Sequence, residues 1–526
     1  MMANSAIPAW RPALVLAVLP ACFAAAALIL RAQGGPYWIW HIVDASYFYL
    51  FDAINLADLS WPGHPYHPGT PVQVLGALIL KALHPGQDLA ERVLDDPEGH
   101  LNLIGDALVG LEALALFAAG FAAFRVTGNL ALALVMEAGP FFSMVILKNA
   151  YHAKPEAMLV ATMALFCAVT LAALRPDALE GRGRTRFALA WGALAGLGVA
   201  TKLTAAPVFL LPVFLLKGRG TAVYVLAALC FFALFMLPAA GALGKFAAHA
   251  ALVMKSSGAH GAGAATVIDV AAYPGAVLKI LKRPAANLPV LLALAVVGWA
   301  AWRKRRGLTF PSPETRALTG VGLAVLAQVL AVAKQPTANY LIPSYMLLPL
   351  AILLAWRIVA ATMPERPRLA APARAGLVLL IALQGFGVAR LSDELDGRRR
   401  DALGLDETAF SACARVYFFP ASHPAFALLL GDWWTGSRHA GAVAARVPPD
   451  VFWFEQNTMT LRDARGPRDL GEIAASYPCL MLRGGHRGPI SAYLAAKLPG
   501  RAFDTACSSG EETVLTSGTD CRKSAP

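Results

Sequence analysis

The sequence predicts a mainly α-helical, polytopic transmembrane bundle of about eleven spans, followed by a small extramembrane α/β domain at the C-terminus. Hydrophobic residues make up 57% of the 526 residues and charged residues only 15%, whereas a soluble domain carries about 25% charged residues. The formal net charge of +12 comes from short Lys and Arg clusters between apolar runs, which argues against nucleic-acid binding. Charges return after Leu391, where the second domain is expected to begin.

Apolar segments long enough to cross a bilayer recur up to residue 390. A spanning helix needs about 17 to 25 apolar residues, because backbone amides inside the hydrocarbon must bond internally. Many more apolar segments follow the first one, so the first segment is interpreted as an uncleaved span rather than as a signal peptide. Pro71–Leu83 is apolar but short, and is expected to be an interfacial helix within the first outer loop, 31–100. The expected spans lie near residues 12–30, 101–124, 130–147, 156–174, 187–200, 203–216, 221–241, 287–302, 317–333, 340–356 and 375–390.

Lys and Arg clusters set the expected orientation, since short cytoplasmic loops are enriched in these residues. All the clusters fall on one side of the membrane if the N-terminus is cytoplasmic. The first outer loop and the domain 391–526 are then expected on the opposite, periplasm-like side. The clusters lie within Arg175–Arg186, Lys217–Arg219, Arg303–Arg306 and Arg357–Arg374.

The C-terminal domain, 391–526, is expected to be a small α/β layer. Apolar segments of strand length predict buried strands at 415–421, 451–455 and 479–484, and the pattern predicts helices at 424–434 and 489–498.

Cysteines add a constraint on this domain. Three of the seven lie in membrane runs, where a free thiol acts as a small apolar group, and four lie in the domain. Four cysteines in an oxidising compartment allow three pairings, of which we expect Cys413–Cys479 with Cys507–Cys521, although the sequence leaves the others open. A metal site is less favoured, because the sequence shows no CxxC or His-x-x-His spacing there.

The first outer loop carries the most distinctive candidate residue. Asp44 opens an aromatic segment, DASYFYLF, at a predicted membrane boundary, and an ionisable residue there needs a partner or a function. We expect Tyr47 and its aromatic neighbours to form the surface of an interfacial helix. A solvated carboxylate on the polar face of that helix is the alternative for Asp44, and a stronger one for Asp52 and Asp58.

Histidines, lysines and one further acid accompany Asp44 in connections assigned to the same membrane face. Any one of the lysines would be interpreted as a snorkelling anchor, and Glu156 beside Pro155 as an ordinary helix start. Together they could neutralise a lipid-linked phosphate. The candidates are His64 and His67 in GHPYHPGTP, Lys148, His152, Lys154 and Glu156 in KNAYHAKPEAML, Lys202 in GVATKLTAAP, and Lys334 in KQPTANYLIPSY.

Five segments, taken in order, resemble the GT-C class of membrane glycosyltransferases. The resemblance is strongest to the bacterial branch related to protein O-mannosyltransferases and aminoarabinose transferases, and it covers residues 12–390. It implies a GT-C-like bundle in the inner membrane and an inverting transferase, which moves one sugar from a polyprenyl-phosphate donor to a lipid, glycan or protein acceptor at the periplasmic face. The segments are DASYFYL, HPGTPVQVLGALILKAL, KNAYHAKPEAMLVATMALF, GLGVATKLTAAPVFLLP and ANYLIPSYMLLPLAIL.

The resemblance also implies roles for individual residues. Asp44 matches the family's acid at the start of the first outer loop, the general base towards the acceptor hydroxyl. Glu156 matches the acid of the second loop, and Lys202 is the expected phosphate contact. Ala45 stands where many members carry a second acid, so no cofactor is expected to be required and a divalent metal is not favoured. The remaining expected substrate-binding residues are Tyr340, His67, His64, His152, Lys154 and Tyr47.

Other classes of function stay open. A transporter or flippase would also have about eleven spans, but transporters usually show internal repeats and polar sites near the membrane midplane. The sequence shows no convincing repeat, and its candidate residues gather at one predicted face. A ligase that moves a whole oligosaccharide is a rival within the enzymes, and a nonenzymatic assembly or sensor protein is a third alternative.

Overall fold

The computed structural model describes residues 10–86, 88–363 and 370–517, and the chain divides into two compact units. The helical unit comprises Met1–Ile29, Pro65–Val72 and Gly105–Ala389. The α/β unit comprises Leu30–His64, Gln73–Ile104 and Arg390–Pro526. Each unit thus combines segments that are distant in sequence. Boundaries between the units fall within α1 (Trp10–Gly34), α3 (Thr70–Leu83), α5 (Pro97–Thr127) and α18 (Ala370–Leu403).

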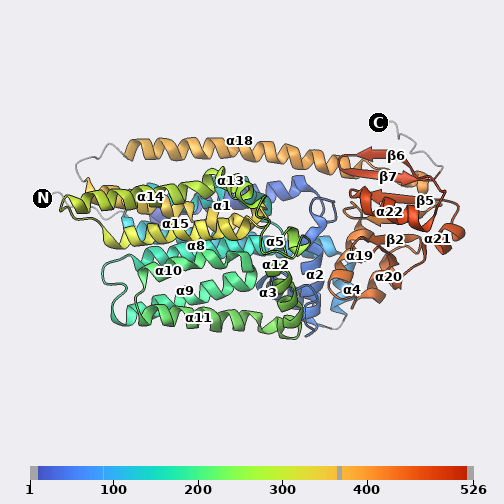
Figure 1. Ribbon diagram of the computed structural model, residues 1–526, viewed down its shortest axis with the longest axis horizontal. Coiled ribbons are helices and arrows are strands. Elements are labelled where there is room, and N and C mark those ends of the chain that lie inside the picture. Colours follow the sequence, from blue (N-terminus) through green and yellow to red (C-terminus); the bar gives the residue numbers. More distant parts are fainter. Residues whose placement is uncertain (1–9, 87, 364–369, 518–526) are drawn as a thin grey trace. The chain divides into compact units, whose positions relative to one another are not determined.

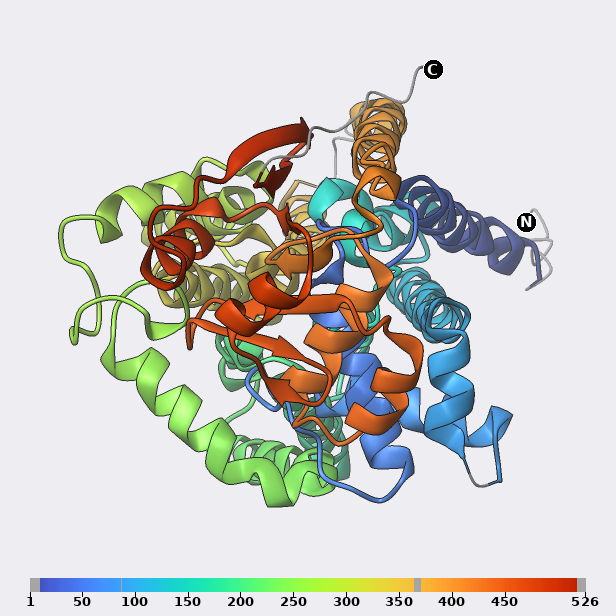
Figure 2. The same ribbon diagram turned by 90° about the vertical axis from the view of Figure 1, so that its right-hand side faces the viewer.

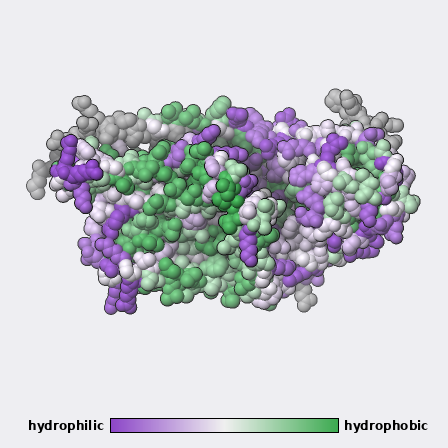
Figure 3. Space-filling model, viewed as in Figure 1, coloured by the Kyte–Doolittle hydropathy of each residue, from purple (hydrophilic) through white to green (hydrophobic). Residues whose placement is uncertain are grey.

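The predicted fold class is confirmed, since helices dominate and the sheet lies in the C-terminal part (Figure 1). Within the described ranges, seven helices are long and apolar enough to cross a membrane. Hydrophobic side chains cover much of the helical unit on the face shown in Figure 3, and hydrophilic ones gather at its left end. The count of eleven spans stays a prediction. The seven are Pro12–Gly34, Pro97–Thr127, Pro155–Ala173, Arg219–Lys255, Pro284–Arg305, Ser312–Val332 and Ala338–Thr362.

The expected span at 130–147 is not one helix, so that prediction of a continuous helix is wrong. Pro140 has no amide hydrogen, and Ser143 is extended, with φ −153° and ψ 122°. The extended backbone at Ser143 ends the helical run, and the proline removes one hydrogen bond from the turn before it. The segment forms α6 (Leu130–Glu137), η1 (Gly139–Phe142) and α7 (Met144–Asn149).

The expected span at 203–216 forms a shorter apolar helix, Leu203–Leu215, and a helix is present at 71–83 as α3, whose interfacial location stays a prediction. Pro207 lies inside a 3-10 helix, η2 (Leu203–Leu210), which passes directly into the short α10 (Leu211–Leu215). The segment is helical throughout but shorter than the seven candidate spans, so its crossing of the membrane stays a prediction.

Two glycines let α9 (Gly181–Thr201) approach α11 (Arg219–Met236). A Cβ atom on Gly192 would lie 2.5 Å from the Ala227 Cβ, and one on Gly196 would lie 2.6 Å from the Phe232 nitrogen. Small residues at this four-residue spacing allow helix backbones to approach closely in membranes. The helix ends at Thr201, because Lys202 is extended with φ −158° and ψ 121°.

Among the other helices of this unit, α14 packs on α15 and α8 packs on α9, and short helices follow α11. Several begin with proline at the first turn, where its missing amide hydrogen costs nothing. They are α8 (Pro155–Ala173), η3 (Leu237–Ala242), α12 (Leu243–Lys255), η4 (Ala259–Gly261), α13 (Tyr273–Leu281), α14 (Pro284–Arg305), α15 (Ser312–Val332), η5 (Ala338–Leu341), α16 (Ile342–Tyr345) and α17 (Leu348–Thr362).

The α/β unit is built on a seven-stranded sheet with the order β4-β3-β2-β1-β5-β7-β6 (Figure 2, orange to red). The strand β1 pairs in parallel with β2 and β5, and the other pairings are antiparallel. The three predicted strands and two predicted helices of this domain are confirmed as β1, β2, β5, α19 and α22. The strands are β1 (Ala414–Phe418), β2 (Val451–Glu455), β3 (Thr460–Asp463), β4 (Gly466–Pro467), β5 (Leu480–Gly484), β6 (Asp504–Ser509) and β7 (Glu512–Thr516).

Alternation along β1 separates the two faces of the sheet. Val416 and Phe418 join an apolar core with residues of α21 and α22, whereas Arg415 and Tyr417 point to the opposite face, where α19 packs. The helices of this unit are α2 (Val43–Ala57), α4 (Leu89–Asp95), η7 (Thr408–Phe410), α19 (Pro424–Trp434), α20 (Ala440–Arg446), α21 (Leu470–Ser476) and α22 (Arg487–Lys497).

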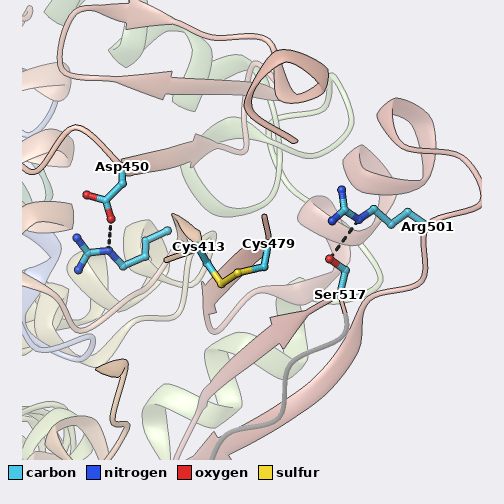
Figure 4. Close-up of a disulfide and its surroundings, with 6 residues drawn as sticks. Cys413, Asp450, Cys479, Arg501 and Ser517 are labelled. Carbon is cyan, nitrogen blue, oxygen red and sulfur yellow. Dashed lines mark hydrogen bonds and ion pairs between the residues drawn. A yellow bond between two sulfur atoms is a disulfide. The ribbon is translucent and has the colours of Figure 1, made fainter. Parts of the chain in front are cut away.

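A disulfide joins Cys413 to Cys479, as predicted (Figure 4). The two cysteines directly precede the neighbouring parallel strands β1 and β5, and the amide of Ala414 donates to the Cys479 carbonyl. The other expected pair includes Cys521, which lies outside the described residues. Cys22, Cys167 and Cys230 are free thiols, as expected of the membrane runs.

Removing this disulfide should destabilise the α/β unit. The bridge closes a loop with a sequence separation of 66 residues, and loop-closure entropy for that length amounts to about 4 kcal/mol. We expect the Cys413→Ser/Cys479→Ser variant to lose about that free energy of unfolding in denaturant titrations. Cys22→Ser, which removes a free thiol, is the control and should unfold like the wild type. A loss no larger than that of the control would contradict the stabilising role.

Candidate active site

A buried ion pair joins the ends of two helices in the helical unit. Glu156 lies in the first turn of α8, and Lys202 directly follows α9. The Lys202 Nζ lies 2.5 Å from the Glu156 Oε1, and the two residues are only 3% and 2% exposed. The amide of Asn339 donates to the same carboxylate oxygen at 2.7 Å. The pair is therefore held by a third side chain and is shielded from water.

Aromatic rings continue this cluster beyond Lys202. The Lys202 Nζ lies 4.2 Å from the centroid of the Tyr340 ring, a cation–π geometry. Three imidazoles follow: His67 is 6.0 Å from Tyr340, 6.0 Å from His249 and 5.7 Å from His260, between ring centroids. These six side chains, with Asn339, are called the ion-pair cluster below.

Gln335 forms hydrogen bonds with two residues at one end of the ion-pair cluster. Its amide nitrogen lies 3.3 Å from the Tyr340 hydroxyl and 3.2 Å from the His260 Nε2. The Gln335 carbonyl oxygen accepts from the His260 backbone amide at 3.2 Å. Two side chains from separate elements are thus fixed by one amide group.

The ion-pair cluster lies at the helix ends opposite to those that carry the arginine clusters. Glu156 starts α8 and Arg175 follows its last turn, while α9 begins among arginines and ends before Lys202. A helix of 19 residues such as α8 is about 28 Å long, close to the hydrocarbon thickness of a bilayer. At the cation-rich ends, one cavity is lined by Arg175, Arg184, Lys217, Glu314 and Arg357. The helices thus have two chemically distinct ends.

The other lysine and histidine candidates of the helical unit lie near the helix ends that carry the ion-pair cluster, or they cap a helix. Lys154 immediately precedes α8 and acts electrostatically on Glu156. His152 is buried, and its ring lies 4.2 Å from that of Tyr151. Lys334 donates to the Val253 and Met254 carbonyls at the end of α12, the usual place for a lysine at a helix C-terminus.

Asp44 belongs to the α/β unit, where it is exposed at a break in α2. Its own backbone is not helical, with φ −66° and ψ 128°, and Ala45 has φ 79° and ψ −47°. An L-residue other than glycine rarely adopts such a positive φ, and this conformation costs about 1 to 3 kcal/mol. Strain of this kind concentrates at functional sites, and here it separates the carboxylate from the regular helix that follows.

The helix that carries Asp44 is packed inside the α/β unit. Tyr47, a predicted substrate-binding residue, is 1% exposed and donates its hydroxyl to the Glu98 carboxylate at 2.8 Å. Burial raises the pKa of Tyr47 well above its ordinary value. Phe48 lies 5.8 Å from Trp434 of α19, between ring centroids, and Phe51 packs on Gly431. The predicted lipid-interfacial location of these aromatic residues is therefore wrong, because α19 covers them.

Asp52 is buried and its carboxylate is enclosed by hydrogen-bond donors, so the alternative of a solvated carboxylate does not hold for it. Its carboxylate accepts from the backbone amides of Gly63 and His64 at 2.6 and 3.1 Å, and from Gln73 at 2.9 Å. A Cβ atom on Gly63 would lie 1.9 Å from the Thr435 carbonyl oxygen, so only glycine fits there. This network holds the His-Pro segment, and the His64 ring packs 5.1 Å from Phe48, between centroids.

The buried carboxyl of Asp52 should make the free energy of unfolding depend on pH near neutrality. Burial raises the pKa of Asp52 to about 7, although its hydrogen bonds oppose the shift. The carboxyl of Asp52 therefore keeps its proton in the folded protein at pH values where the unfolded chain has lost it, above about pH 4. The contribution of this proton to the free energy of unfolding is complete below that pH and is lost as pH rises through about 7. We expect the free energy of unfolding to fall by about 1 kcal/mol from pH 6 to pH 8, and this fall to vanish in Asp52→Asn.

Thermal unfolding at the two pH values measures this effect. Asp58→Asn, at the exposed end of the same helix, is the matched control and should keep the pH dependence of the wild type. A neighbouring carboxyl is less suitable for this window, because burial raises the pKa of Asp432 only to about 6. An unchanged pH dependence in Asp52→Asn would contradict the assignment.

The structure brings together four of the predicted site residues, Glu156, Lys202, Tyr340 and His67, in the helical unit. Asp44, Tyr47 and His64 belong to the α/β unit. The sequence interpretation missed His249, His260, Gln335 and Asn339. The two histidines interrupt otherwise apolar or small-residue segments, a signal of function in a membrane protein. Across the described ranges, His, Cys, Asp and Glu side chains form no group of three that could hold a metal ion.

No protein-family model matches the chain, and no curated protein sequence matches it. Among solved structures, the chain is similar to the crystal structure of ArnT from Cupriavidus metallidurans bound to undecaprenyl phosphate. This match has a TM-score of 0.41 and 14% sequence identity, and it covers 94% of this chain and 97% of that chain. A likeness at this TM-score does not establish a shared family, so the function has to be inferred from the residues of this chain.

Proposed function

We propose that the protein is a membrane glycosyltransferase that moves a monosaccharide from a polyprenyl-phosphate donor to an acceptor hydroxyl. The observation that carries this proposal is the ion-pair cluster, a buried lysine with a carboxylate, an aromatic ring and three imidazoles at one end of an apolar bundle. Buried ionisable groups in a membrane protein are costly and mark functional sites. The sequence resemblance to the GT-C class supports the same reaction.

The ion-pair cluster suits a lipid-linked phosphate. When the sugar leaves its carrier, the phosphate gains charge, and cations and N–H donors nearby stabilise it. Lys202 supplies a fixed ammonium group, and the ring nitrogens of His67, His249 and His260 supply further hydrogen-bonding groups. Glu156 and Asn339 act as positioning residues, because Glu156 holds the ammonium group and Asn339 holds the Glu156 carboxylate. The apolar helices offer an environment for the isoprenoid chain.

Asp44 is proposed as the general base. A sugar 1-phosphate ester is already activated, so the protein has to remove the proton of the acceptor hydroxyl and accept the leaving phosphate. The oxygen of the acceptor forms the new bond to the anomeric carbon while the bond to the phosphate oxygen breaks. Such a direct displacement inverts the anomeric configuration. The scheme needs no cofactor, because carboxylate, ammonium and imidazole groups supply the required charges.

The proposed location is a bacterial inner membrane, with a cytoplasmic N-terminus and the α/β unit in the periplasm. Arginine-rich helix ends favour the cytoplasmic side. The Cys413–Cys479 disulfide supports an oxidising compartment for the α/β unit. The ion-pair cluster, at the opposite helix ends, would then serve the periplasmic leaflet.

Proteoliposomes with a radiolabelled polyprenyl-phosphate sugar test the proposal against a flippase. A transferase moves label to envelope acceptors supplied outside the vesicle, and transfer requires no movement of the donor between leaflets. A flippase changes the leaflet of the labelled lipid but leaves its sugar attached. Label that changes leaflet and stays on the polyprenyl carrier would overturn the proposed function.

A further inference from the structure

A cavity of about 670 Å³ opens on the α19 face of the sheet in the α/β unit. Trp38, the connection between α18 and β1, and the side chains of Arg415, His423 and Arg483 line it. All of these residues belong to one compact unit. Ligand pockets commonly enclose about 300 to 1,000 Å³, so the volume suits a ligand of one or two sugar rings. None of the residues given a role in the proposed reaction lines it.

The charges in this cavity already have partners. The Arg483 guanidinium bonds to Glu407 and Glu512, each at 2.7 Å, and is itself buried. Arg415 donates through Nε to Asp450 at 2.8 Å. An ionic ligand would have to compete with these carboxylates. A neutral ligand could instead bond to the fixed planar groups without breaking an ion pair.

The remaining polar groups offer both a donor and an acceptor. The His423 Nδ1 accepts from the Ala425 amide at 3.2 Å, and burial lowers the pKa of this imidazole to about 4. The ring is therefore neutral at pH 7, and its hydrogen lies on Nε2. Asp406 accepts from the Thr408 amide and hydroxyl at 2.9 and 2.8 Å, and these bonds lower the pKa of its carboxyl. Its carboxylate is ionised and fixed in orientation.

We propose that this cavity binds a neutral saccharide, and that the saccharide is a non-reacting part of the acceptor. Sugar hydroxyls donate and accept at once, which matches fixed carboxylates, guanidinium groups and an imidazole N–H. Trp38 is among the lining residues, and tryptophan rings are amphipathic surfaces suited to the C–H side of a sugar. The acceptor role rests on the proposed function, but saccharide binding itself does not.

The cavity lies close to the proposed base along the chain. Trp38 precedes Asp44 by six residues, so their Cα atoms lie at most about 20 Å apart. The intervening segment is fixed, because the Trp40 amide donates to the Ser422 hydroxyl at 2.9 Å. A saccharide in the cavity would thus hold a longer glycan acceptor within reach of Asp44. Binding energy from such a remote contact lowers the KM for the acceptor.

Two neighbouring exposed residues provide a matched test. Ser411 lines the cavity, whereas Ala412 does not, and both are exposed. Ser411→Trp should fill the cavity mouth, and Ala412→Trp adds the same bulk beside it. Binding of cellobiose, chitobiose, mannobiose and lactose is measured by saturation-transfer NMR on the full-length protein in nanodiscs, because glycoside detergents would compete. Glycylglycine serves as a zwitterionic comparison.

We expect at least one disaccharide to bind the wild type and Ala412→Trp equally, and Ser411→Trp to weaken that binding at least tenfold. Binding of glycylglycine alone, no disaccharide binding, or equal binding by the two tryptophan variants would overturn the inference. Asp44→Asn should keep disaccharide binding. If sugar transfer occurs without disaccharide binding, the inference fails and the proposed function stands. If disaccharides bind but no donor sugar is ever transferred, the saccharide site stands and the proposed function fails.

Discussion

Asp44→Asn should lower kcat for sugar transfer by about 100- to 10,000-fold, the usual contribution of a general base. The asparagine has nearly the same shape, but it cannot take the proton of the acceptor hydroxyl. Because asparagine keeps the shape of the side chain, the variant should stay folded and inserted, which its unfolding temperature checks. The KM for the donor should also change little, because the phosphate is assigned to other residues. Steady-state kinetics with a purified polyprenyl-phosphate sugar measure both constants.

Asp58→Asn is the matched control for this loss. It removes an exposed carboxylate at the other end of α2 and should leave kcat unchanged. Asp44 lies at the break near the start of α2, whereas Asp58 caps the opposite end of the same helix. Full activity of Asp44→Asn would remove Asp44 as the base.

Breaking the buried ion pair should affect both stability and activity. Glu156→Gln leaves the Lys202 ammonium group buried without its carboxylate, and Lys202→Met leaves the carboxylate without its ammonium group. Either change should cost about 3 to 5 kcal/mol of unfolding free energy, because an uncompensated buried charge remains. The double variant should regain much of that stability, since it contains no buried charge at either position.

Activity separates the two roles of the pair. We expect the double variant to stay inactive, because it lacks the ammonium group that is proposed to stabilise the leaving phosphate. If transfer returned together with stability, the pair would be structural only. Glu314 and Arg357 form a control pair, 2.7 Å apart and partly exposed. Glu314→Gln/Arg357→Met should cost about 1 kcal/mol or less and leave transfer intact.

Apolar length and strand patterning predicted most of the architecture. The segments before Pro176 and before Arg306 are long, apolar and bounded by proline or arginine, so both helices follow from composition. The strands at 451–455 and 479–484 are short apolar runs between polar turns, and their positions could be predicted within one or two residues. The interruption at Pro140 was missed, because hydropathy alone does not distinguish a continuous helix from a broken one.

Tertiary contacts explain what the sequence could not predict. Tyr47, Phe48 and Phe51 have the composition of an interfacial helix, but α19, which lies nearly 400 residues later, covers them. The sequence around Asp52 is typical of a surface carboxylate, but in the fold backbone amides from the His-Pro segment enclose this side chain. The pairing of Lys202 with Glu156 likewise joins residues far apart in sequence. These contacts depend on the fold rather than on any local pattern.

The anomeric configuration of the product tests the central claim most directly. A donor of defined configuration is incubated with the purified protein and acceptor, and NMR of the anomeric proton identifies the new linkage. Direct attack by a hydroxyl activated at Asp44, with departure of the polyprenyl phosphate, predicts the opposite configuration in the product. A product that retains the configuration of the donor would contradict this mechanism.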